Sequence, residues 1–184
     1  MRMQGEQRIA RPPAAVWAAL NDPDILKGCI PGCETLEKLS DTAFQAAAAV
    51  RVGPVQARFK GKITLSDMEP PHRYRISGEG QGGAAGFVRG GADVRLEPVD
   101  GATCLHYTVD ATVGGKLAQM GGRVVDQAAR QMADTFFSNL NVALTEPQAA
   151  APAVPAATRL LPVPMWIALA IAMAVFALYL VGLP

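Results

Sequence analysis

Runs in which apolar and polar residues alternate fill most of the chain between residues 42 and 113. The clearest is Val55–Ser66, where the odd positions are apolar or Gly and every even position is polar. A period of two places successive side chains on opposite faces of a strand, so one face is predicted to be buried and the other solvated. Similar runs are, in order, Thr42–Val52, Arg73–Glu79, Val88–Glu97 and Cys104–Val113. Short turns separate them and predict an antiparallel meander.

A different period follows these strands. Apolar residues recur every third or fourth position and predict one amphipathic helix over Lys116–Leu144, whose apolar stripe needs a surface to cover. Before the meander, the chain predicts a strand over Arg2–Ala10, two short helices and a second strand over Glu34–Leu39. This order is that of the helix-grip fold, an α+β fold whose curved antiparallel β-sheet wraps around a long C-terminal α-helix.

The C-terminal part has another composition. Residues 147–164 are rich in Ala and Pro, with Arg159 as the only charge, and predict a linker. Met165–Leu183 carries no charge, and at 1.5 Å per residue its nineteen residues would reach about 28 Å, close to a bilayer core of ~30 Å. We therefore expect a helix-grip domain at 1–146 and a single-pass transmembrane anchor at 165–183. A buried globular helix is the alternative.

Charge and cysteine content narrow the picture. A net charge of +1 gives no reason to expect nucleic-acid binding, and three Cys are too few for a disulfide scaffold. Cys29 and Cys33 supply half a zinc site at best, so no metal is expected there. Small turn residues or a reversible disulfide are the other interpretations. The N-terminus lacks a secretory signal, so the main domain is expected on the cytoplasmic side of the cell inner membrane.

The inward faces of the strands and of the final helix predict a hydrophobic cavity. Its expected lining is Phe44, Phe59, Ile63, Tyr74, Ile76, Val94, Leu105, Tyr107, Leu117, Met120, Val124, Met132 and Phe136. Two tyrosine hydroxyls are the only polar groups in this set, which suits a long apolar ligand with one or two oxygens, such as a quinone. Small inward residues, including Ala48 and Ala92, leave room that close packing would otherwise fill. The alternative is that these side chains form a solid core.

Catalysis has little support in the sequence. No Asp, Glu or His falls on an inward position of the clearly alternating strands, so no catalytic residue is expected. The outward positions of three consecutive strands are basic, and we expect them to form a patch that faces anionic lipid or an acidic partner. A solvated sheet face is the alternative. The patch consists of Arg51, Arg58, Lys60, Lys62, Arg73 and Arg75.

Several short segments, in this order along the chain, carry a resemblance to a known family. They are Asn21-Asp22-Pro23, Cys29-Ile30-Pro31-Gly32-Cys33, Val52-Gly53-Pro54, Phe59-Lys60-Gly61, Pro71-His72-Arg73-Tyr74, Gly78-Glu79-Gly80, Gly115-Lys116-Leu117-Ala118 and Gly121-Gly122-Arg123. Together they resemble the carbon monoxide dehydrogenase G-subunit family, of the START-type (SRPBCC) helix-grip superfamily. The match covers residues 1 to 145.

The resemblance implies a membrane-anchored accessory protein and not an enzyme. Such a protein would bind a hydrophobic ligand, menaquinone or ubiquinone, without a covalently bound cofactor. It would recruit a molybdenum-containing carbon monoxide dehydrogenase or a related hydroxylase to the cytoplasmic membrane. Two other functions stay open at this point: a docking protein without a ligand, and a START-type enzyme that acts on an apolar substrate.

Overall fold

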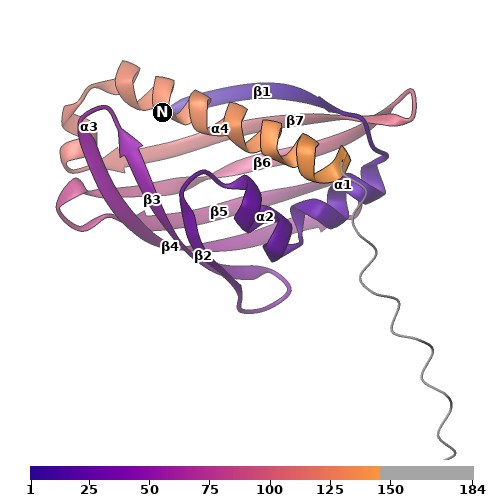
Figure 1. The fold of residues 1–184 in the computed structure, drawn as a ribbon, viewed down its shortest axis with the longest axis horizontal. Helices are drawn as coiled ribbons and strands as arrows, with labels where there is room; N and C mark the ends of the chain where they lie inside the picture. The colour runs from indigo at the N-terminus through magenta and orange to yellow at the C-terminus, as the bar shows by residue number, and fades with distance from the viewer. Residues whose placement is uncertain (146–184) are drawn as a thin grey trace, which may run out of the picture. The chain divides into compact units, whose positions relative to one another are not determined.

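A computed structural model describes residues 1–145, which form one curved antiparallel sheet and the helices that it encloses (Figure 1). The seven strands lie in the order β1-β7-β6-β5-β4-β3-β2. Their bounds are β1 Arg2–Ile9, β2 Cys33–Lys38, β3 Ala43–Val52, β4 Val55–Glu69, β5 Arg73–Gln81, β6 Phe87–Val99 and β7 Ala102–Gly114. From β2 to β7 each strand pairs with the next one along the chain, as the alternating pattern predicts.

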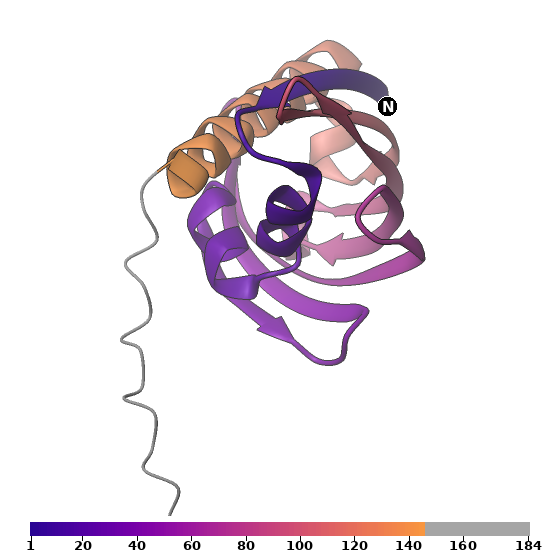
Figure 2. The same ribbon diagram turned by 90° about the vertical axis from the view of Figure 1, so that its right-hand side faces the viewer.

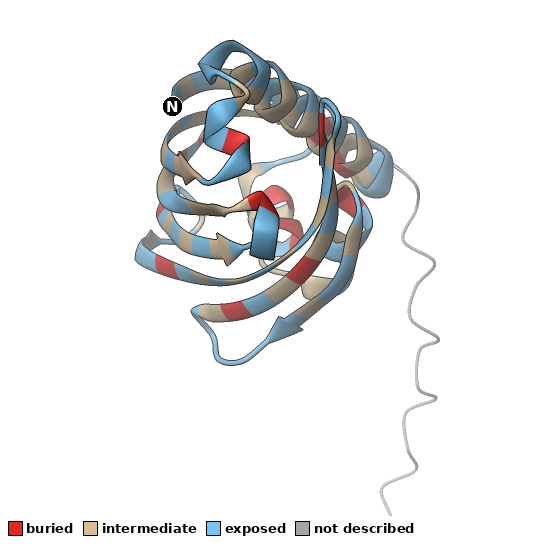
Figure 3. Ribbon diagram, turned by 90° about the vertical axis from the view of Figure 1, so that its left-hand side faces the viewer, coloured by how far each residue is buried: buried red, intermediate tan, exposed pale blue. Residues whose placement is uncertain are grey.

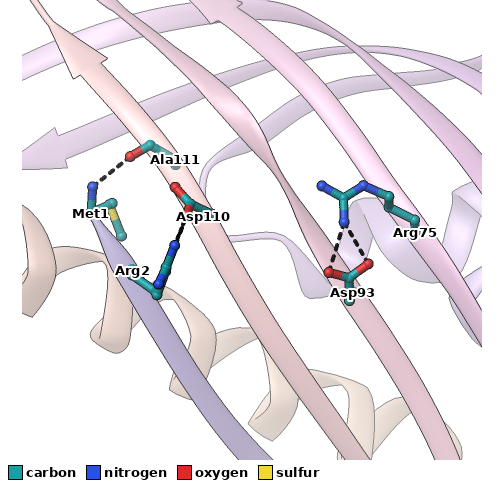
Figure 4. Close-up of polar contacts among 6 residues, drawn as sticks. All are labelled: Met1, Arg2, Arg75, Asp93, Asp110 and Ala111. Atoms are coloured by element: carbon teal, nitrogen blue, oxygen red, sulfur yellow. Dashed lines mark hydrogen bonds and ion pairs between the residues drawn. The ribbon is translucent and has the colours of Figure 1, made fainter.

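The first strand, β1, pairs with the last strand, β7, and so completes the sheet. β1 pairs with β7 in a register that runs from Arg2 opposite Asp110 to Ile9 opposite Thr103. The Met1 ammonium group donates to the Ala111 carbonyl at 2.6 Å, and Arg2 donates to the Asp110 carboxylate at 2.9 Å (Figure 4). The first residues are therefore held as an edge strand of the sheet.

Two short helices follow β1, and their sequences explain where they begin. In α1 (Pro13–Leu20), Pro occupies the first turn, where its missing N–H leaves no hydrogen bond unmade. In α2 (Pro23–Cys29), the Asp22 carboxylate accepts hydrogen bonds from the backbone N–H groups of Asp24 and Ile25 and so caps the helix. The sheet curves around these helices and the C-terminal helix (Figure 2).

The prediction of one continuous helix from Lys116 is wrong. The segment forms a single turn, α3 (Lys116–Gln119), and then a long helix, α4 (Gly122–Thr145). Gly121 between them has φ of +87°, a left-handed conformation that ends a helix and that Gly adopts without strain. Because of this break, α3 and α4 are two separate helices and not one continuous helix.

The core lies where α1, α4 and the sheet meet. Leu140 of α4, Val16 of α1 and Ile9 of β1 are at most 1% exposed, as are Leu96 and Leu105 of the sheet. Buried positions occur on the strands of the sheet and on the helices (Figure 3). The side chain of Asn139 also donates to the Cys29 carbonyl at 3.2 Å, which ties α4 to the end of α2.

The predicted linker and membrane anchor, residues 147–164 and 165–183, lie outside the described residues. Among residues 1–145, no helix combines the length and the apolar character that a membrane span requires.

Candidate functional site

A cavity of about 350 Å³ lies between the concave face of the sheet, α2 and the middle of α4. Its lining side chains are apolar apart from two tyrosine hydroxyls. They are Met3, Leu20, Leu26, Ile30, Pro31, Leu36, Phe44, Ile63, Leu65, Tyr74, Ile76, Ala92, Val94, Leu105, Tyr107, Val109, Met132, Ala133, Phe136 and Phe137. The volume is at the lower end of the ~300–1,000 Å³ typical of ligand sites.

Most of the residues predicted to line a cavity do line this one. Strands contribute the larger part, because alternate positions of β3 to β7 face inward. The predicted residues that the structure brings together here are Phe44, Ile63, Tyr74, Ile76, Val94, Leu105, Tyr107, Met132 and Phe136. Their role in binding a ligand stays a prediction.

Four predicted residues lie elsewhere. Phe59 is in β4 beside Gly82, where a side chain on the glycine would collide with its ring. Leu117 is buried in α3, on the other side of the break at Gly121. Met120 and Val124 approach the β3–β4 turn at Gly53 and not the cavity. The same reason explains why all four residues were wrongly placed at the cavity. A period identifies which face of a strand or helix a residue occupies, but it does not show how far along that element the cavity extends.

Sequence reasoning left out several lining residues. Ile30 and Pro31 belong to the turn after α2, where no period assigns a face. Ala133 and Phe137 are each one residue beyond the predicted stripe of the final helix, and the breadth of a helix face, wider than one line of residues, is the signal that could have found them. Leu65 is an apolar odd position of the run Val55–Ser66, so the alternation that predicts Ile63 to line the cavity could also have predicted Leu65.

The two tyrosines are held by aromatic contacts. Tyr74 is 5% exposed and packs edge-on against Trp17, with ring centroids 5.2 Å apart. Tyr107 stacks on Phe137 at 5.3 Å. Within residues 1–145 no fully buried side-chain oxygen or nitrogen lacks a hydrogen-bond partner. Burial raises the pKa of both phenols from the ordinary value of 10.0, so both hydroxyls stay protonated and can donate at neutral pH.

The raised pKa of Tyr74 predicts how stability depends on alkaline pH. Its contribution is fully present below the unfolded-state pKa near 10.0 and is lost as pH rises through the higher folded-state pKa, because the unfolded chain loses its proton first. We expect Tyr74→Phe to remove part of this alkaline loss in urea unfolding between about pH 9 and 12, the range that begins just below the unfolded-state pKa. Tyr107→Phe is the comparison, with a smaller expected effect because Tyr107 is less buried. An identical alkaline loss in Tyr74→Phe and the wild type would contradict the prediction.

A second hollow, of about 380 Å³, shares Pro31 and Met132 with the cavity. It lies between the α2–β2 turn, the β3–β4 turn and α4, and its rim includes Arg51, Gln131 and Thr135. Pro31 and Met132 thus line both hollows, so the second hollow lies next to the apolar cavity on this side. The shared boundary therefore forms a candidate mouth with polar groups around it.

Half of the outward basic patch is paired with carboxylates. All six side chains are exposed, but Arg58 forms an ion pair with Glu34, and Arg75 donates to both oxygens of Asp93 at 2.7 and 2.8 Å (Figure 4). Arg73 donates to Glu69 at 2.6 Å, which lowers the pKa of that carboxyl group. Glu69 is close to Arg73 in sequence, whereas Glu34 and Asp93 come from other strands. Register brings in the others, since Asp93 of β6 lies directly opposite Arg75.

All three cysteines are free thiols. Cys29 is buried at the end of α2, and Cys33 is partly buried at the start of β2. Burial raises the pKa of both thiols, which favours the thiol over the thiolate that a metal or an electrophile requires. Packing in the α2–β2 turn accounts for this pair.

Comparison with solved structures shows the same fold in other proteins. A conserved protein from Geobacillus kaustophilus is 31% identical, with a TM-score of 0.74 over 78% of this chain and 95% of that one. A protein from Thermus thermophilus is 15% identical, with a TM-score of 0.60 over 78% and 97%. One from Rhizobium leguminosarum is 17% identical, with a TM-score of 0.61 over 78% and 93%. The last two show the helix-grip fold alone.

Comparison with known sequences identifies the family. No curated protein matches the chain. The sequence profile of the carbon monoxide dehydrogenase G subunit (CoxG) matches residues 5–145, which include every strand from β2 to β7, most of β1 and all four α-helices. The chain therefore belongs to the carbon monoxide dehydrogenase G-subunit (CoxG) family.

Proposed function

We propose that this protein is a membrane-anchored accessory protein that binds a respiratory quinone in its apolar cavity. In this proposal it is not an enzyme. It recruits a carbon monoxide dehydrogenase-type molybdenum hydroxylase to the cytoplasmic membrane, where quinone is available. Family membership and the helix-grip fold support the general role, a ligand-binding accessory protein.

One observation supports the ligand class most directly. The residues that line the cavity are apolar except for Tyr74 and Tyr107, the two among them that carry a hydroxyl group. A quinone ring is apolar on its faces and carries two carbonyl oxygens at its edge, which accept hydrogen bonds. Protonated phenol hydroxyls are suitable donors to such oxygens. This chemistry fits menaquinone and ubiquinone equally.

The size of the cavity adds a constraint on the bound state. A volume of about 350 Å³ suits the ring and the first part of an isoprenoid tail, not a long tail as a whole. The rest of the tail would leave through the candidate mouth between Pro31 and Met132. A bound quinone with its tail at the mouth could pass between this domain and a bilayer without exposing its ring to water.

The alternative of a START-type enzyme lacks a chemical group to support it. No Asp, Glu, His, Lys, Arg or Cys is among the described residues that line the cavity. General acid–base catalysis needs a titratable group within hydrogen-bond reach of the substrate, and nucleophilic catalysis needs an activated nucleophile. Two phenols with raised pKa values are weak candidates for either role.

The test of the ligand is extraction of the full-length chain from membranes, followed by mass spectrometry of its organic extract. Because the cavity admits one ring, we expect close to one quinone per chain, well above the quinone-to-phospholipid ratio of the same extract. A quinone content that only follows the phospholipid content would contradict quinone binding.

The test of anchoring and recruitment is deletion of residues 147–184. The hydroxylase activity is then expected to move from the membrane fraction to the soluble fraction, because the apolar segment 165–183 would no longer hold the complex. Activity that stays on the membrane would contradict this part. Release of the enzyme by the deletion, combined with an empty cavity in the full chain, would leave docking alone as the function.

A further inference from the structure

We propose that Glu6, Cys104 and His106 form a zinc site on the convex face of the sheet. One oxygen of Glu6, the Cys104 sulfur and one His106 ring nitrogen all lie within 4.8 Å of one another. These residues come from the two strands β1 and β7, on the face opposite the apolar cavity. Leu105 and Tyr107, which alternate with Cys104 and His106, point inward to the cavity.

Strand register explains why the three groups meet. Glu6 of β1 lies directly opposite His106 of β7, and Cys104 is two residues from His106 on the same strand face. Cross-strand neighbours on one face are the sheet equivalent of the i, i+4 pairs that hold zinc on helices. Because β1 and β7 are far apart in sequence, no short motif reveals the site.

The ligand set suits zinc. Zn²⁺ binds thiolate, imidazole and carboxylate groups at roughly 2.0–2.3 Å, which places the ligand atoms about 3.5 Å apart in a tetrahedron. The three groups here need only a small contraction to reach that spacing. Glu6 is well exposed, with its side chain 74% accessible, so rotation of this side chain can supply the change. Water would occupy the fourth position, as in zinc sites with three protein ligands.

A second carboxylate is placed to orient the histidine. His106 Nδ1 lies 3.7 Å from a Glu6 oxygen, and His106 Nε2 lies 3.6 Å from a Glu97 oxygen. If Nδ1 binds the metal, the proton resides on Nε2, which faces the Glu97 carboxylate. A carboxylate behind a ligating imidazole fixes the ring and raises its basicity, as commonly seen around bound zinc.

Surface ion pairing is the competing explanation for this cluster. Arg95 lies 3.9 Å from Glu97 and would support it, although exposed pairs of this kind contribute little to stability. This explanation assigns no role to the thiol of Cys104. The two explanations differ in what they predict for a thiophilic cation, so the sulfur is the group on which the test depends.

The experiment uses the full-length chain in detergent, freed of metal with a chelator and kept reduced. Zn²⁺ is titrated in competition with a chromophoric chelator, and Co²⁺ serves as the spectroscopic probe. We expect one metal per chain and a thiolate-to-cobalt charge-transfer band. Cys104→Ser should remove the band, and Glu97→Gln should weaken Zn²⁺ binding about 10-fold or more through the histidine. Cys33→Ser, which alters the other partly exposed thiol, should change neither.

Three outcomes would overturn the proposal. The first is Co²⁺ binding without a charge-transfer band. The second is a band that Cys33→Ser removes and Cys104→Ser does not. The third is equal Zn²⁺ affinity in all variants, which indicates scattered surface carboxylates. Quinone binding is expected to be unchanged in Cys104→Ser, since the sulfur lies on the other face of β7, so the zinc and quinone proposals can fail separately.

Discussion

Replacing Ala92 by Phe is expected to reduce the affinity for quinone by about 100-fold, because overpacking a filled site costs ~1–3 kcal/mol and about 1.4 kcal/mol corresponds to tenfold. Ala92 lines the cavity, and its neighbours in register are Ile76 of β5 and Val109 of β7, which line it too. A phenyl ring at this position would extend into a space of about 350 Å³ that the quinone ring must occupy. Calorimetric titration of the full-length chain with a short-tailed quinone measures the loss.

The matched control for this variant is Ala18→Phe. Ala18 lies in α1 but is exposed, so the same added ring enters solvent and not the cavity. We expect its quinone affinity to equal that of the wild type. Ala48, which the sequence predicts to be a small inward residue, is not among the residues that line the cavity. Equal quinone affinity in Ala92→Phe and Ala18→Phe would rule out the cavity as the binding site.

Leu140→Ala is expected to lower the free energy of unfolding by about 2–5 kcal/mol, the cost of an unfilled core cavity. Leu140 is 0% exposed and packs in the core with Ile9 and Val16. Since domains of this kind are stable by only about 5–15 kcal/mol, the change would remove a large part of the total. Urea unfolding of the full-length chain in detergent, followed by circular dichroism, measures it.

The comparison for this variant comes from the same helix. Val142 is 55% exposed, two residues further along α4. Val142→Ala is expected to change stability by no more than about 0.5 kcal/mol, as for most surface positions. If both substitutions had equally small effects, the C-terminal half of α4 would not be packed against α1 and the sheet in solution.

The sheet and its inward faces could be predicted from the sequence because β-strand periodicity is local. In Val55–Ser66 the alternation of apolar and polar residues is enough to predict which face of the strand each residue occupies. The structure extends that strand to Glu69 and confirms the antiparallel meander. The α3–α4 break was harder to predict. The apolar period continues across the Gly121-Gly122 pair, which is a turn signal in the sequence, and the left-handed backbone of Gly121 shows that the helix ends there.

Properties that depend on register were not predictable. The pairing of Arg75 with Asp93 and the meeting of Glu6 with His106 both need the alignment of strands that are separate in sequence. Phe59 lies beside Gly82 and is not among the residues that line the cavity, and the alternation does not show how far along β4 the cavity extends. Periodicity contains neither piece of information, since it describes one element at a time.

The pairing of β1 with β7 also sets a condition on synthesis. Arg2 and Asp110, which bond across these strands, are 108 positions apart. During translation β1 therefore emerges from the ribosome long before β7. Its backbone N–H and C=O groups have no partner strand until nearly the whole domain has been made. Closing so long a loop is slow compared with forming the neighbouring hairpins. We expect nascent chains shorter than this separation to depend on chaperones, and the domain to acquire protease resistance only after β7 has been made.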